Sequence, residues 1–302
     1  MAFISYLFYR VSIGLMALVP FRLLYLKSNF LSFFLFRVLK YRRTVVEDNL
    51  LWCFPDLTPE ERHEIAKNSY TNLSDLIFES FKAPSMSKSE MMVRYAVPNH
   101  EMIDNLAQKH GGVIIVGGHY TNWEWGGIST GYHFDTPLKA LYKPLRNPYI
   151  NRYINQARST GGTTMVDIKE TRNLFASASE TPLIYVFVAD QSPSNMREAI
   201  WLEFLGRDTA CLHGPEKYGR KTEYPIVFFI PKRVSRGKYV AEMINLTDQI
   251  DYEHPGSITK SFMNTLEMYI RKKPEDWLWT HKRWKRRREE AQEQMEKISN
   301  LD

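Results

Sequence analysis

The chain is poor in cysteine, with only Cys53 and Cys211 among its 302 residues. Because these two lie far apart in the sequence, a disulfide framework is not expected and a reducing compartment is favoured. His213 follows Cys211 by two positions, but closeness in sequence does not make a catalytic pair. No spacing of cysteine and histidine matches a zinc site, and we predict no metal and no other cofactor.

Nucleotide-binding signatures are absent as well. The sequence has neither a Walker phosphate loop nor a Gly-x-Gly-x-x-Gly motif, so nucleotide chemistry is not indicated. It also lacks an internal repeat and a low-complexity linker, which favours one domain with an N-terminal appendage. The 40 Lys and Arg residues exceed the 34 Asp and Glu residues only slightly, giving a formal net charge of +6. This small excess suits an anionic surface or an acidic partner without identifying one.

A clean membrane span of about 20 apolar residues is missing too. The N-terminal residues are strongly apolar, but Arg10 and Arg22 interrupt the runs Phe3–Tyr9 and Val11–Phe21. No small-residue cleavage site stands out, so a cleaved signal peptide is not expected. Three interpretations stay open: an imperfect transmembrane helix, an amphipathic helix in the membrane interface with snorkelling arginines, or a buried helix of the folded domain.

Positive charges lie after this apolar segment and again near the C-terminus. The first group comprises Arg22, Lys27, Arg37, Lys40, Arg42 and Arg43, and by the positive-inside rule it places the body of the protein in the cytoplasm. The second group comprises Lys282, Arg283, Lys285, Arg286, Arg287 and Arg288, with Trp284 inside it. This cluster could attract anionic lipid head groups, at ~1 kcal/mol per charge. It could equally bind RNA, or form a solvated helix face balanced by Glu289, Glu290 and Glu293. The aromatic residue and the apolar N-terminus favour the membrane, and we predict no nucleic-acid partner.

From residue 113 onward the pattern alternates between strands and helices. The apolar runs predict strands at Val113–Val116, Leu138–Tyr142, Thr164–Val166, Leu183–Ala189, Ile226–Ile230 and Tyr239–Ile244. Helices are predicted at Tyr149–Ser159, Glu170–Ser179 and Ser257–Lys273, and from a capping box at Thr58 to Pro84. The helix predicted from Thr58 to Pro84 carries a mostly apolar stripe that is typical of a core face. Its residues are Ile65, Ser69, Leu73, Ile77 and Phe81. The alternation predicts an α/β fold with a mixed, largely parallel sheet flanked by helices.

The first of these strands ends in the most informative stretch. After Val113–Val116 come Gly117 and Gly118, then His119, with Glu124 five positions later. Ligands of open α/β sheets bind just beyond the carboxyl ends of strands, where these side chains would lie. A histidine with a pKa near 6.5 can take a proton from a hydroxyl, and a carboxylate on its other nitrogen fixes the tautomer. We therefore predict His119 as general base and Glu124 as the group that orients it.

Structural interpretations of these residues stay open beside the catalytic one. Asn122 could be the N-cap of a helix, which would place Glu124 in the first turn, where the helix dipole favours it. Asp190, with Gln191 after it, follows another strand and could serve the same site or cap a turn.

A competing motif is present nearby. Gly127–Gly131 matches the Gly-x-Ser-x-Gly nucleophile elbow, with Ser129 as nucleophile, although no strand precedes it.

The ordered set of motifs resembles one family, the bacterial lipid A late (lauroyl/myristoyl) acyltransferases. Gly118–Trp125 resembles their His-x4-Asp/Glu block, and Tyr142–Pro148 their Tyr-Arg/Lys-Pro…Asn-Pro block. Arg158 falls where the family has a functionally important arginine, and Asp190-Gln191 matches an Asp-Gln/His block. Further matches are Asn49-Leu50 with Phe54-Pro55, Phe204-x-Gly206-x-x-Thr209, and Trp279–Lys285.

The resemblance implies a fold like that of glycerolipid acyltransferases and an enzyme of the bacterial inner membrane, with its active site on the cytoplasmic side. Residues 1–40 would be a membrane anchor or interfacial helices, and residues 41–302 the acyltransferase domain. The enzyme would transfer an acyl chain from acyl carrier protein, or from acyl-CoA, to a hydroxyl of a lipid A precursor.

The acyl group would be transferred directly, without an acyl-enzyme. His119 would be the base, and Arg158 would hold a phosphate. Asp190, Asn122 and Gln191 would support the site, and backbone N–H groups after Gly118 would meet the oxyanion. Alternatives are another lipid acceptor, such as a lysophospholipid or aminolipid, a serine-nucleophile hydrolase, or a non-enzymatic membrane-binding protein.

Overall fold

Seven strands form the central sheet, in the order β1-β9-β8-β2-β5-β3-β4. The computed structural model describes residues 1–176 and 179–289. The strands are β1 (Tyr95–Ala96), β2 (Gly112–Gly117), β3 (Leu138–Tyr142), β4 (Thr164–Asp167), β5 (Leu183–Val188), β8 (Ile226–Ser235) and β9 (Lys238–Asn245). Each neighbouring pair is parallel except β8 with β9, which is antiparallel. The predicted mixed, largely parallel sheet is confirmed.

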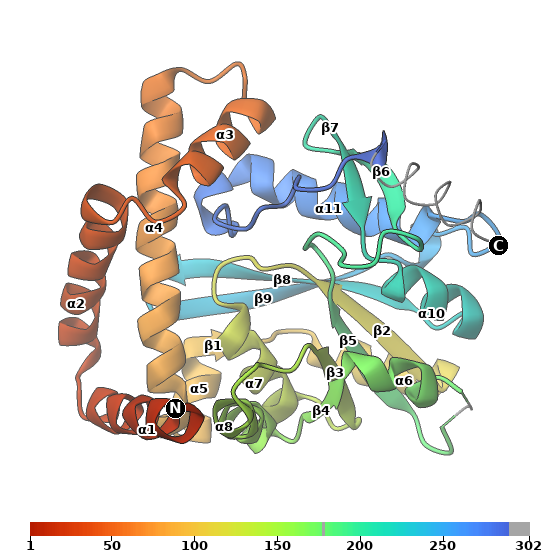
Figure 1. Ribbon diagram of the computed structural model, residues 1–302. Helices are drawn as coiled ribbons and strands as arrows, with labels where there is room; N and C mark the ends of the chain where they lie inside the picture. Colours follow the sequence, from red (N-terminus) through yellow and green to blue (C-terminus); the bar gives the residue numbers. More distant parts are fainter. Residues whose placement is uncertain (177–178, 290–302) are drawn as a thin grey trace.

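Helices surround the sheet, as Figure 1 shows. They are α1 (Ala2–Ala17), α2 (Phe21–Phe33), the π-helix η1 (Phe34–Val38), α3 (Arg43–Cys53), α4 (Pro59–Lys82), α5 (Lys88–Arg94), α6 (His100–His110), α7 (Trp123–His133), α8 (Pro148–Arg158), α9 (Thr171–Leu174), α10 (Gly214–Thr222) and α11 (Ser257–Lys272). The predicted capping box starts α4: the Glu61 N–H donates to Thr58 Oγ1, and the Thr58 N–H donates to the Glu61 carboxylate. The predicted core stripe of α4 is only partly buried, because the face turned inward carries Tyr70, Asp75 and Glu79 instead.

Every predicted strand is present, but three further strands and one helix differ from the sequence prediction. The two-residue strand β1 was missed. So was the separate antiparallel hairpin of β6 (Ile200–Phe204) and β7 (Arg207–Cys211). The helix predicted at Glu170–Ser179 is only partly confirmed, because α9 (Thr171–Leu174) is one turn long and Phe175 stacks on Tyr218 with ring centroids 4.3 Å apart. Residues 177 and 178 lie outside the described residues.

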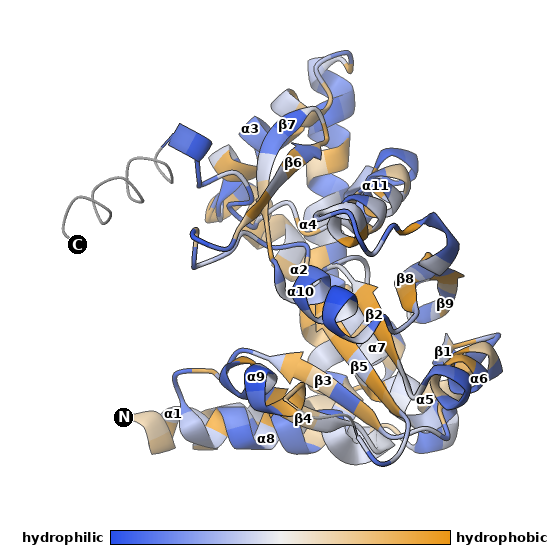
Figure 2. Ribbon diagram, turned by 90° about the vertical axis from the view of Figure 1, so that its right-hand side faces the viewer, coloured by the Kyte–Doolittle hydropathy of each residue, from blue (hydrophilic) through white to orange (hydrophobic). Residues whose placement is uncertain are grey.

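The sheet's apolar strands make the core of the molecule. Figure 2 shows β2, β3, β5 and β8 as its most hydrophobic elements, and β2 is buried along its whole length. Two parallel strands, β2 and β5, run side by side with Gly117 opposite Val188. The residues that follow them therefore emerge together at one edge of the sheet.

The N-terminal helices lie against the long helix α4. Both α1 and α2 contact α4, and α1 also contacts α8 (Figure 1). Among the described residues, no helix has the length and apolar character needed to cross a membrane. Neither helix is buried as a core helix would be, since Phe8 is 77% and Phe30 is 71% exposed. The exposed apolar side chains of this segment are Phe3, Ile4, Leu7, Phe8, Val11, Leu15, Leu18, Leu23, Leu26, Phe30 and Phe33.

Candidate active site

His119 and Asp190 meet at the carboxyl ends of β2 and β5. The Ala189 N–H donates to the Gly117 carbonyl at 2.9 Å, which continues the pairing of the two strands by one residue. His119 Nδ1 lies 2.6 Å from Asp190 Oδ1, and the His119 backbone N–H donates to Oδ2 at 2.9 Å. A Cβ on Gly118 would approach this carboxylate to 3.3 Å, so the glycine admits the close contact.

The environment keeps Asp190 charged and favours protonation of His119. Burial would raise the pKa of Asp190, but the charge and hydrogen bonds of His119 and the indole N–H of Trp277, at 2.9 Å, hold this pKa at about 2. Burial would likewise lower the pKa of His119, but the Asp190 carboxylate outweighs it and raises this pKa above its ordinary value. Because Asp190 occupies Nδ1, Nε2 is the nitrogen left to meet a substrate.

Glu124 does not make the predicted hydrogen bond to His119. Its carboxylate pairs with Arg158, from Nη2 to Oε1 at 2.7 Å and from Nε to Oε2 at 3.1 Å. The reason is local: Asn122 caps α7 by accepting the Trp125 N–H at 2.8 Å, so Glu124 lies in the first turn of the helix and pairs with Arg158 on α8. The Glu124 charge still raises the pKa of His119, and that of Arg158 lowers it. Asp190 therefore takes the orienting position expected for Glu124.

Asn122 ties the His119 loop to a buried polar cluster. Its amide donates to Glu79 Oε2 at 2.6 Å, and Asn122 is wholly buried. Glu79, on α4, also accepts from the hydroxyls of Tyr25 at 2.8 Å and Tyr239 at 2.7 Å. The cluster connects α2, α4, α7 and β9, so it fixes the loop that carries His119.

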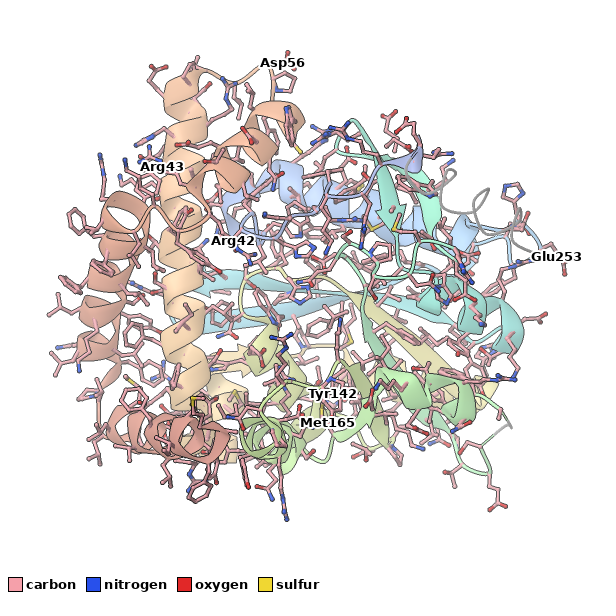
Figure 3. All side chains as sticks on the ribbon, viewed as in Figure 1. Arg42, Arg43, Asp56, Tyr142, Met165 and Glu253 are labelled. Atoms are coloured by element: carbon pink, nitrogen blue, oxygen red, sulfur yellow. The ribbon has the colours of Figure 1, made fainter. Side chains whose placement is uncertain are left out.

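A groove of about 410 Å³ lies beside this pair. Its lining residues are Leu35, Tyr41, Arg42, Leu73, Leu76, Ile77, Trp123, Gln191, Leu278, Thr280 and His281. The side formed by η1 and α4 is aliphatic, whereas Arg42, Gln191 and His281 make the other side polar. The Trp123 ring meets the His119 ring edge to face, with centroids 4.9 Å apart. Figure 3 shows Arg42 beside α4, and its guanidinium donates to the Thr280 carbonyl at 3.0 Å. The mixed lining suits an amphiphilic ligand, and Trp123 connects the groove to His119.

One of the two remaining chemical expectations from the sequence is wrong. Ser129 is no nucleophile elbow, because it lies buried inside α7 and donates to the Tyr95 carbonyl at 2.8 Å. Of the backbone N–H groups after Gly118, the first three are already bonded within the protein. Those of His119, Tyr120 and Thr121 donate to Asp190, to the Gly118 carbonyl and to the Asp276 carbonyl.

The basic cluster of the tail is partly an internal anchor. Arg283 is 1% exposed and donates to the Ala210 carbonyl at 2.6 Å and to Cys211 Sγ at 3.3 Å. Trp284 donates to Thr209 Oγ1. Within the cluster, Lys282, Lys285 and Arg287 are exposed, whereas Arg288 pairs with Asp208. Fewer charges than expected are therefore available to an anionic surface. Glu290 and Glu293 lie outside the described residues.

Sequence reasoning missed three residues of the site: Glu79, Trp277 and His281. The first sits on a helix whose apolar spacing favoured a core role. Trp277 contacts a residue 87 positions away, and His281 a residue 89 positions away. No local pattern marks such contacts, although His281 lies in the tail block that carried part of the resemblance.

Comparisons with known proteins agree over nearly the whole chain. A family model described as bacterial lipid A biosynthesis acyltransferase matches residues 2–286. The lipid A biosynthesis lauroyltransferase of Escherichia coli (strain K12) is 24% identical over 285 residues, 92% of each chain. The palmitoleoyltransferase of the same strain is 22% identical, covering 82% of this chain and 80% of the relative. A lipid A biosynthesis acyltransferase of Haemophilus influenzae is 25% identical, covering 82% and 79%.

Proposed function

The chain belongs to the bacterial lipid A biosynthesis acyltransferase family, and we propose that it transfers a fatty acyl chain from acyl carrier protein, or from acyl-CoA, to a hydroxyl of a lipid A precursor. The family makes the protein an acyltransferase, and its relatives are named for lipid A biosynthesis. Acylation of another lipid acceptor, such as a lysophospholipid or aminolipid, is the alternative within the same class.

The observation that carries the mechanism is the buried His119–Asp190 pair. His119 Nε2 takes the proton of the acceptor hydroxyl as its oxygen attacks the thioester carbonyl. Asp190 holds the tautomer and stabilises the imidazolium that forms. The tetrahedral intermediate then expels the thiolate of the donor, which takes the proton back from His119. One ester bond forms, one thioester bond breaks, and the proton is returned.

Direct transfer, with no acyl-enzyme, fits the surroundings of His119. Within residues 1–176 and 179–289, no serine or cysteine side chain is hydrogen-bonded to its imidazole. Cys53 and Cys211 are buried, and burial raises the pKa of both thiols.

The same proposal places the enzyme on the cytoplasmic side of the bacterial inner membrane. The exposed apolar side chains of α1 and α2 support an interfacial attachment, because such a face is costly in water. Vesicle flotation tests this placement: Phe8→Asp combined with Phe30→Asp should release the protein from anionic vesicles. Met268→Asp, at an exposed apolar position on α11, is the matched control and should stay bound. Equal flotation of all three proteins would refute the attachment.

Mass spectrometry of lipid A from cells with and without the gene tests the acceptor. Loss of one acyl chain from lipid A is expected, and its mass identifies the chain length. Unchanged lipid A with a loss of acylated lysophospholipid or aminolipid would favour the alternative acceptor.

A further inference from the structure

The proposed acyl transfer requires a hydrogen-bond donor for the oxyanion, and the inference below rests on that proposed function. A negative charge develops on the acyl carbonyl oxygen when the hydroxyl attacks, and a preorganised donor must meet it there. The backbone N–H groups of His119, Tyr120 and Thr121 are already bonded within the protein. Arg158 is held by both oxygens of Glu124. None of these groups is free to meet the oxyanion, so another donor near the groove is needed.

The segment Trp277–His281 lies directly against the His119–Asp190 pair. The Trp277 indole donates to Asp190, and the Leu278 N–H donates to the His119 carbonyl at 3.1 Å. The His281 N–H donates back to the Leu278 carbonyl at 3.1 Å. These bonds place the His281 ring beside the pair, where it lines the groove together with Trp123 and Gln191.

The protonation state of His281 follows from one contact. Its Nε2 lies 3.2 Å from the backbone N of Ser192, two residues after Asp190. A backbone N–H can only donate, so Nε2 is the acceptor and the ring proton is on Nδ1. Burial lowers the pKa of His281 to about 4, outweighing the nearby Asp190 carboxylate. The ring is thus a neutral donor at the pH of the cytoplasm. Within the described part of the chain, Nδ1 makes no hydrogen bond to the protein.

We propose that the Nδ1–H of His281 donates a hydrogen bond to the acyl carbonyl oxygen and stabilises the oxyanion of the tetrahedral intermediate. The hydrogen-bond partners of His119 and His281 then give the two rings opposite roles. A carboxylate on Nδ1 makes His119 the base, and an amide on Nε2 makes His281 the donor. The acyl chain lies along the aliphatic side of the groove, and its carbonyl points to the polar side.

Two variants separate this role from a structural one. The amide of Asn places a donor near the position of His Nδ1, whereas the amide of Gln reaches the position of Nε2. His281→Asn therefore keeps a donor for the substrate and loses the acceptor for Ser192. His281→Gln keeps the acceptor and loses the donor. His110→Gln, at an exposed position on α6, is the matched control.

Steady-state kinetics of the purified enzymes with an acyl-CoA or acyl carrier protein donor and a lipid A precursor decides between the roles. We expect His281→Gln to lose about 10²- to 10³-fold in kcat with little change in KM. His281→Asn should keep kcat within about ten-fold of the wild type, and His110→Gln should match it. Thermal unfolding of each variant shows that it is folded.

The inference is overturned if His281→Gln keeps the wild-type kcat, or if His281→Asn loses as much kcat as His281→Gln. If one variant does not fold, the split between kcat and KM in the other still decides. A wild-type enzyme without acyl transfer in the same assay would instead count against the proposed function, so the two failures are distinguishable.

Discussion

Replacing Asp190 by Asn removes the charge that tunes His119 while keeping the shape of the side chain. Asp190 is 2% exposed and bonds His119 at both Nδ1 and the backbone N–H. An opposite charge at this range shifts a pKa by about 1 to 3, and each pKa unit corresponds to about 1.4 kcal/mol. The imidazolium formed during attack therefore loses about 1.4 to 4 kcal/mol of stabilisation, a fall of about ten-fold to a thousand-fold in kcat/KM.

The pH dependence of Asp190→Asn gives a second, independent readout. In the wild type the pKa of His119 is raised, so the neutral base is lost, and kcat/KM falls, as the pH drops through that pKa. Without the carboxylate, burial dominates and lowers the pKa of His119, so this acid limb moves to lower pH while the plateau falls. Profiles of kcat/KM from about pH 5 to 9 measure both effects. If Asp190→Asn kept its acid limb at the wild-type pH and its kcat/KM near that of the wild type, the role of Asp190 would be refuted. The refutation would be strongest if Glu124→Gln lost kcat/KM instead.

Three further predictions follow from the surroundings of the pair. Arg158→Gln should move the acid limb to higher pH, because the Arg158 charge lowers the pKa of His119. Glu124→Gln should move it to lower pH, because the Glu124 charge raises that pKa. Shifts of both variants in the same direction would contradict this. Glu79→Ala should lower the free energy of unfolding by about 3 to 5 kcal/mol, since Tyr25, Asn122 and Tyr239 lose their buried acceptor. In the same denaturant titration, exposed Glu64→Ala should cost about 0.5 kcal/mol at most. Ser129→Ala should keep wild-type acyl transfer at a stability cost of about 1 kcal/mol, whereas abolished transfer in a folded variant would favour a serine nucleophile.

Much of the fold could be predicted because its signals are local. Uniformly apolar runs such as Val113–Val116 report burial on both faces of a parallel sheet, and they mark β2 and β5 correctly. The capping box at Thr58 likewise sets the start of α4. The hairpin of β6 and β7 was missed because its packing against distant segments, not an alternating pattern, determines its structure.

The sequence marked His119, Glu124 and Asp190 as candidates, but it did not predict how they pair. His119 and Glu124 were paired because they lie close in the sequence, yet a capped helix turns Glu124 away. Asp190 lies 71 positions from His119 in the sequence. The order of the parallel strands brings the two residues together, and the sequence of neither strand predicts that order. The burial of charged residues such as Glu79 and Arg283 was missed for the same reason, since their partners lie on other elements.

Acyl transfer by the purified enzyme tests the central claim most directly. Wild-type protein, acyl carrier protein loaded with a fatty acyl chain, and a lipid A precursor are combined, and the lipid product and the intact protein are weighed by mass spectrometry. We predict that the lipid gains the mass of one acyl chain, that the enzyme never carries this mass, and that folded His119→Ala is about 10²- to 10⁴-fold slower. An acylated enzyme, or a His119→Ala variant as fast as the wild type, would contradict direct transfer by the His119–Asp190 pair.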